Sequence, residues 1–170
     1  MAQATQFPVT RSSFSELVQP ILGWPLSLAW RGHGSALFLE LGPLARASKR
    51  SGLRRSTHPR GAATIMIEWS WRVERARSIE VGSFSSERRI EAGIARIGGS
   101  RITAVDVAGR LPELVVELSD GRRIHSFMTA EGQPAWVVFL PDRSWITVER
   151  GALVHDTQNV RRRRATGSSA

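Results

Sequence analysis

The chain contains no cysteine and no tyrosine, has a single lysine, and includes no long apolar run. Without cysteine it can form no disulfide, thiolate metal site or cysteine nucleophile, and a reducing compartment is the expected setting. No stretch approaches the ~20 apolar residues of a membrane span, and residues 1–14 lack the basic and apolar regions of a signal peptide. We therefore expect a cytoplasmic protein with no membrane segment.

The length of 170 residues corresponds to one domain, and the content of 41% hydrophobic and 23% charged residues argues against disorder throughout the chain. Arginine outnumbers lysine 23 to 1. We attribute this bias to a GC-rich bacterial or phage genome rather than to a function.

The net charge of +9 is concentrated in two segments, residues 43–62 and residues 156–170. The two segments together contain ten lysine and arginine residues, which is more than the net charge, so the rest of the chain is close to neutral. Such segments either contact the phosphates of a nucleic acid, or pair with the carboxylates of a protein partner, or are solvated and bind nothing. The candidate binding residues are Arg46, Lys49, Arg50, Arg54, Arg55 and Arg60 in the first segment and Arg161, Arg162, Arg163 and Arg164 in the second.

Residues 25–41 resemble residues 102–118 at a constant offset of 77 positions without a gap. The similarity is one of pattern more than of identity, and it indicates a strand–turn–strand unit that occurs twice. The aligned pairs include Gly32 with Gly109, Leu37 with Leu114, Glu40 with Glu117, Leu28 with Val105, and Trp30 with Val107.

Turn residues and hydrophobic periodicity predict two helices among many short strands. Residues 64–74 show the clearest alternation of apolar and polar positions. Residues 84–97 form an amphipathic helix with Ile90, Ile94 and Ile97 on one side, and residues 12–22 form a shorter helix capped by Ser12 or Ser13. The other expected strands are 26–30, 36–41, 78–82, 102–107, 113–118, 122–127, 136–140 and 145–149.

The predicted fold class is mainly β (α+β), with two related antiparallel units bridged by one amphipathic helix and packed as a single sandwich-like domain. We expect unit one at 23–82, the helix at 84–97 and unit two at 101–155. Residues 1–22 precede this domain, residues 43–62 form a basic insertion, and residues 156–170 form a disordered basic tail.

Several motifs of the second half carry a family resemblance. They are LVVELSDGRRIHSF at 114–127, the pair Ala135-Trp136, and WITVERGAL at 145–153. With a helix before GGSRITAVDV at 98–107, the chain from Gly23 to Val154 resembles a group of small uncharacterised bacterial domains of unknown function. The resemblance implies a duplicated β-rich fold and no particular activity or catalytic residue. The basic insertion departs from the short connection of that group.

No set of residues indicates catalysis, a metal site or a cofactor. The four histidines, His33, His58, His125 and His155, are far apart in the sequence and form no ligand motif. Glu40 and Glu117 occupy equivalent positions of the repeat, so they either meet as a carboxylate pair or, as we favour, are outward residues of two alternating strands.

Six tryptophans provide aromatic volume for a core, and a minority of them are candidates for contact with a protein partner. The candidates for protein contact are Trp69, Trp71, Trp136 and Trp145. Trp69 and Trp71 fall on one face of the expected strand 64–74, and Trp136 and Trp145 fall on neighbouring strands.

Three classes of function follow. The first is a non-enzymatic interaction module, such as an accessory, inhibitor or immunity-like protein of a bacterial or phage conflict system, that docks on a larger protein or ribonucleoprotein partner. The second is a nucleic-acid-binding accessory protein that uses both basic segments. The third is an enzyme, and we disfavour it because the sequence holds no nucleophile–base pair or metal-ligand set.

Overall fold

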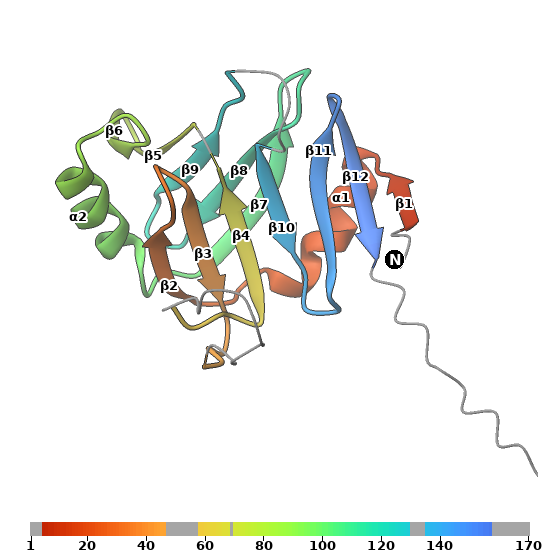
Figure 1. The fold of residues 1–170 in the computed structure, drawn as a ribbon, viewed down its shortest axis with the longest axis horizontal. Helices are drawn as coiled ribbons and strands as arrows, with labels where there is room; N and C mark the ends of the chain where they lie inside the picture. The colour runs from red at the N-terminus through yellow and green to blue at the C-terminus, as the bar shows by residue number, and fades with distance from the viewer. Residues whose placement is uncertain (1–4, 47–57, 69, 130–134, 158–170) are drawn as a thin grey trace, which may run out of the picture.

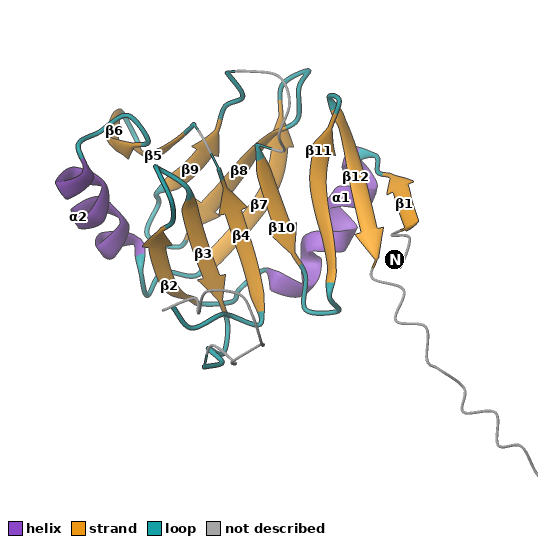
Figure 2. Cartoon of the chain, viewed as in Figure 1, coloured by secondary structure: helices purple, strands orange, loops and turns teal. Residues whose placement is uncertain are grey.

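The computed structural model describes residues 5–46, 58–68, 70–129 and 135–157. Two antiparallel sheets pack face to face, and two α-helices lie at the ends of this sandwich (Figures 1 and 2). The elements are β1 (Thr5–Pro8), α1 (Arg11–Val18), a 3-10 turn (Gln19–Ile21), β2 (Leu26–Arg31), β3 (Leu37–Leu41), β4 (Ala63–Ile67), β5 (Trp71–Arg75), β6 (Ser78–Gly82), α2 (Glu87–Ile97), β7 (Ile102–Ala108), β8 (Glu113–Leu118), β9 (Arg123–Ser126), β10 (Trp136–Phe139), β11 (Ser144–Glu149) and β12 (Ala152–Thr157).

The seven-stranded sheet has the order β1-β12-β11-β10-β4-β3-β2, and the five-stranded sheet has the order β6-β5-β9-β8-β7. Apolar side chains from the inner faces of both sheets form one core, in which Leu39, Ile65, Val116 and Ile124 are fully buried. The predicted fold class, a mainly β sandwich-like domain with two related antiparallel units, is confirmed.

The alternating segment 64–74 is not one strand. It forms β4 in one sheet, which ends at Ile67, and β5 in the other, which begins at Trp71. The alternation continues across this change of sheet because Ile65 and Ile67 face the same core as Trp71 and Val73, and all four are fully buried. Periodicity reports which side chains are buried and does not report a change of sheet.

The two halves of the chain have equivalent strand pairings. Strands β2, β3 and β4 form a meander in the seven-stranded sheet, while the hairpin β5–β6 of the same half joins the other sheet. Strands β7, β8 and β9 form the corresponding meander in the five-stranded sheet, and the hairpin β10–β11 joins the first sheet. The halves therefore exchange hairpins around an approximate twofold axis.

This axis passes between the chain segments that precede β2 and β7. Gly23 N donates to Ile102 O at 2.7 Å, and Gly99 N donates to Leu26 O at 2.9 Å. The same exchange recurs one step further along, with Leu26 N bonded to Ser100 O and Ile102 N bonded to Trp24 O. Leu26 is thus equivalent to Ile102, an offset of 76.

The ungapped alignment predicted from sequence is therefore one residue out of register in the first strand. Both β2–β3 and β7–β8 carry an irregularity at the same place, between Leu26 and Leu28 in one hairpin and between Ile102 and Ala104 in the other. Beyond it, Trp30 pairs with Phe38 and Asp106 pairs with Val115. Trp30 is equivalent to Asp106, and not to Val107 as the sequence alignment indicated.

The helices of the two halves are related by the same offset of 76 residues. Phe14, Val18 and Ile21 are buried at positions that correspond to Ile90, Ile94 and Ile97 on α2. Helix α1 contacts β7 and helix α2 contacts β2, so each helix packs on the first strand of the other half. The cap of α1 is Thr10, whose side chain accepts from Ser13 N at 3.1 Å, and neither Ser12 nor Ser13 is the cap.

Two strands at one edge of the seven-stranded sheet were not predicted. β12 continues to Thr157, into the part of the chain expected to be a disordered tail, and β1 pairs with it. The N-terminal segment is therefore part of the sandwich. The predicted basic tail beyond Thr157 lies outside the described residues.

Candidate functional site

The outer face of the seven-stranded sheet carries a row of large apolar side chains. Trp30 of β2, Phe38 of β3, Met66 of β4, Phe139 of β10 and Trp145 of β11 are all partly exposed. Trp30, Phe38 and Met66 are cross-strand neighbours, and Phe139 is the neighbour of Trp145. We call these five residues the aromatic face. In Figure 1 this sheet faces the viewer and α1 lies behind β11 and β12.

A buried carboxylate fixes one end of the aromatic face. Glu40 is fully buried, and its Oε1 accepts from Trp30 Nε1 at 3.0 Å. Its Oε2 accepts from Thr64 Oγ1 at 2.6 Å and from the backbone N–H of Gly61 at 2.8 Å. A Cβ at position 61 would lie 2.5 Å from Leu41 N, so only glycine allows this close approach. The bonds to Thr64 and Gly61 hold the carboxylate in place, and the carboxylate fixes the orientation of the Trp30 indole.

The end of the basic segment 43–62 is attached to the same place. The Trp30 ring lies between two other rings, with Phe38 stacked at 4.1 Å and His58 stacked at 4.4 Å between centroids. Ala45 and Arg60 pair through two backbone hydrogen bonds of 2.8 and 3.1 Å. The described ends of the segment are therefore held beside the aromatic face.

Of the predicted basic residues, Arg46 and Arg60 are described, and both are exposed at this edge. A shallow pocket of about 310 Å³ opens between β2 and α2, and its lining includes Trp30, Arg31, His58 and Glu91. The other predicted cations, Lys49, Arg50, Arg54, Arg55, Arg161, Arg162, Arg163 and Arg164, lie outside the described residues.

The outer face of the five-stranded sheet differs in character. There Arg72 forms an ion pair with Glu74, and Arg123 forms one with Glu117. His125 lies between Arg72 and Val115 in the cross-strand register. Paired charges suit a solvated surface, so the two outer faces of the sandwich have opposite chemistry.

The predicted contact tryptophans fall into different environments. Trp71 and Trp136 are fully buried core residues and cannot touch a partner of the folded chain. Their indole N–H groups cross the core: Trp71 Nε1 donates to Ser35 O at 2.6 Å, and Trp136 Nε1 donates to Pro112 O at 2.9 Å. Trp145 lies on the aromatic face, and Trp69 lies outside the described side chains.

The acidic and histidine candidates do not lie together at one site. Glu40 lies on the outer face of the seven-stranded sheet and Glu117 on the outer face of the other sheet, so they do not form a carboxylate pair. His33 is exposed in the β2–β3 turn, and His155 lies on β12. Among the described residues, no three histidine, aspartate or glutamate side chains are arranged to hold a metal ion.

A charge cluster surrounds Glu80 where β6, α2 and the β8–β9 turn meet. The Glu80 carboxylate is 4% exposed and receives Arg75 Nε at 3.0 Å, Arg122 Nε at 2.8 Å and Arg96 Nη1 at 3.4 Å. The hydrogen bond from Arg75 is the largest cause, and those from Arg122 and Arg96 add to it against the opposing effect of burial. Together they lower the pKa of Glu80 to about 2.

This cluster predicts a loss of stability in acid. Because the folded pKa of Glu80 is below its ordinary value of 4.5, the stabilisation is complete above about pH 4.5 and disappears as the pH falls towards 2. We expect about 2 kcal/mol from this group, after a discount for the exposed Arg75 and Arg96. Urea unfolding at pH 7, 5, 4 and 3 measures how the free energy of unfolding depends on pH. In Glu80→Gln this dependence should be weaker over the same range. If the free energy of unfolding of Glu80→Gln depends on pH as strongly as that of the unchanged protein, other groups cause the acid sensitivity.

Neither of the described helices combines the length and the apolar character that crossing a membrane requires. Comparison of the chain with protein-family models, with curated proteins and with solved structures found no match. The resemblance to uncharacterised bacterial domains therefore stays an expectation.

Proposed function

We propose that this protein is a non-enzymatic interaction module that docks on a larger protein partner through the aromatic face and the adjoining basic segment. The observation that supports the proposal is their juxtaposition: Trp30 packs against Phe38 on the sheet and against His58 at the end of the basic segment. Apolar aromatic side chains beside a pocket are the usual anchors of protein interfaces. The exposed Arg46 and Arg60, which we call the arginine rim, can pair with acidic side chains of a partner.

The partner is therefore a protein with an apolar patch bordered by carboxylates. Docking of this kind suits an accessory, inhibitor or immunity-like protein of a bacterial or phage conflict system, because such a protein acts by covering a surface. The cytoplasm is the compartment we propose, on the basis of a chain without cysteine.

The test begins with affinity capture from the source organism, followed by binding measurements with the purified partner. Phe139→Ala and Trp145→Ala should each weaken binding at least tenfold, because anchor aromatics contribute roughly 2 kcal/mol or more. Phe84→Ala is the matched control, since Phe84 is 84% exposed in the β6–α2 turn, away from the aromatic face. Equal effects at all three positions would contradict the proposed surface.

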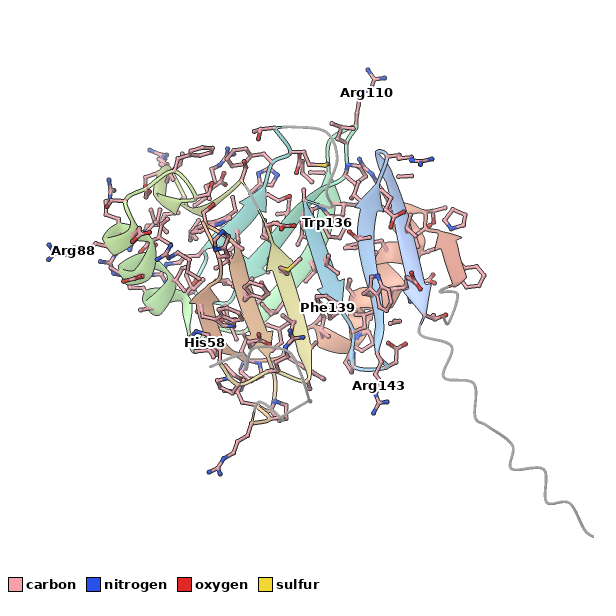
Figure 3. All side chains as sticks on the ribbon, in the orientation of Figure 1. His58, Arg88, Arg110, Trp136, Phe139 and Arg143 are labelled. Carbon is pink, nitrogen blue, oxygen red and sulfur yellow. The ribbon has the colours of Figure 1, made fainter. Side chains whose placement is uncertain are left out.

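A charge test uses two matched pairs. Arg46→Glu with Arg60→Glu should weaken binding to the partner, whereas Arg88→Glu with Arg110→Glu should not, because Arg88 and Arg110 project from other sides of the molecule (Figure 3). Circular dichroism establishes that each variant is folded. If both pairs weaken binding equally, attraction depends on net charge and not on the arginine rim.

A second candidate is a nucleic-acid-binding accessory protein, favoured by the same combination of exposed arginines and partly exposed aromatic rings. Aromatic rings in a positively charged setting stack the bases of single strands. Fluorescence anisotropy with a labelled single-stranded oligonucleotide at 50 and 200 mM salt distinguishes the two candidates. Tight binding with a steep salt dependence that Trp145→Ala reduces would favour nucleic acid over a protein partner.

A further inference from the structure

A second pocket, of about 270 Å³, lies on the outer face of the five-stranded sheet. It is separate from the aromatic face and is not used by the proposed function. Its lining includes Ala104 and Asp106 of β7, Val115 and Glu117 of β8, and Arg123 of β9. The pocket thus combines a small apolar floor with two carboxylates and one guanidinium.

The internal repeat shows what occupies the same position in the other half. Cross-strand pairing matches Ala104–Glu117 with Leu28–Glu40, and it matches Asp106–Val115 with Trp30–Phe38. The carboxylate of the pocket is therefore the counterpart of the buried carboxylate beneath the aromatic face.

In the first half this position is filled by an indole. The Trp30 ring lies on Phe38 with an interplanar angle of 7°, and its N–H donates to the equivalent carboxylate, Glu40. In the second half Asp106 replaces the indole, and its carboxylate turns back to accept from the backbone N–H of Val107 at 2.7 Å. The space above Val115 is left as the pocket.

The second donor to the carboxylate is also replaced. Thr64, which donates to Glu40, is equivalent in register to Arg123, which forms an ion pair with Glu117. The carboxylate of the second half is therefore held in place from the same side by a different donor. Glu117 is 43% exposed, compared with the fully buried Glu40, so it is accessible from the pocket.

We propose that this pocket binds a planar aromatic ring that carries an N–H donor, and that indole is its type ligand. The ring lies over Val115 and Ala104, and its N–H donates to Glu117, as Trp30 does to Glu40 within the same chain. Two carboxylates against one arginine favour a neutral or cationic ring over an anionic one. The indole comes either from a small molecule or from the tryptophan side chain of a bound polypeptide.

The experiment titrates the full-length chain, labelled with ¹³C at methyl groups, with indole and with N-acetyltryptophanamide. Both probes should shift the methyl resonances of Ala104, Ala108 and Val115, with saturation in the millimolar range. Stronger binding of N-acetyltryptophanamide identifies a polypeptide tryptophan as the source, and stronger binding of indole identifies a small molecule. 1-Methylindole, which lacks the donor, should bind at least fivefold more weakly.

The decisive variant is Asp106→Trp, which rebuilds the arrangement of the first half. We expect it to fill the pocket, abolish probe binding and add one indole N–H resonance, whereas Asp106→Ala should still bind. If Asp106→Trp does not fold, Ala104→Leu introduces the residue found at Leu28 and should weaken binding at least threefold. The proposal is overturned if neither probe shifts these methyl groups, if 1-methylindole binds as well as indole, or if binding persists in the filled variants.

Discussion

Replacement of Trp71 or Trp136 with alanine is expected to lower the free energy of unfolding by about 3–5 kcal/mol, which is the range for a large aromatic side chain removed from a core. The two residues occupy equivalent register positions, Trp71 opposite Ser126 and Trp136 opposite Ile67, and both are fully buried. Each bridges the two sheets through its indole bond to a turn carbonyl. We therefore expect nearly equal losses, measured by urea denaturation.

The phenylalanine variants separate the hydrogen bond from the packing. Trp71→Phe and Trp136→Phe keep most of the apolar volume but leave the Ser35 or Pro112 carbonyl without its donor. The expected loss is about 1–3 kcal/mol, smaller than that of alanine. A loss below about 1 kcal/mol in both alanine variants would contradict a core role for these tryptophans.

The second large effect concerns Glu40, and the chain supplies its own control at Glu117. Glu40→Ala leaves three donors without their acceptor, the Trp30 indole, the Thr64 hydroxyl and the Gly61 N–H. We expect a loss of about 2–4 kcal/mol, because buried donors without a partner cost more than the bonds contribute. Glu117→Ala removes one exposed ion pair with Arg123 and should cost less than about 0.5 kcal/mol.

Thermal unfolding followed by circular dichroism compares the two variants directly. The Glu40→Ala variant should also release the Trp30–His58 stack, which the indole N–H resonance of Trp30 reports in a nitrogen–proton correlation spectrum. Similar losses in both variants would mean that the carboxylate of Glu40 is as dispensable as that of Glu117.

Fold class could be predicted from the sequence because the inner faces of the strands alternate regularly with polar positions. The fully buried Ile65, Ile67, Trp71 and Val73 are an example. What alternation cannot show is which sheet a strand joins. The change of sheet between β4 and β5 was therefore not predicted, and neither was the exchange of hairpins.

Of the five residues of the aromatic face, only Trp145 was predicted as a contact residue, and the others were missed for a related physical reason. In β3 an outward phenylalanine, Phe38, lies between the inward Leu37 and Leu39, so the strand reads as continuously apolar and its two sides cannot be told apart. Trp30 was aligned with the buried Val107 because the connection between the paired strands is one residue longer in the second half, where Asp106 pairs with Val115, than in the first, where Trp30 pairs with Phe38. A one-residue shift turns every later side chain to the opposite face.

The exchange of hairpins also governs how this chain can be synthesised and folded. Strand β4 pairs with β10, and β5 pairs with β9, so neither sheet is complete until residues far along the chain have left the ribosome. Until then the first half exposes two open strand edges, to which a neighbouring nascent chain could add its own strands. Completion of the fold therefore waits for β9 and β10, and it should be slow, since its pairings join distant parts of the chain. A truncated copy ending after β6 should pair with a second copy rather than remain single.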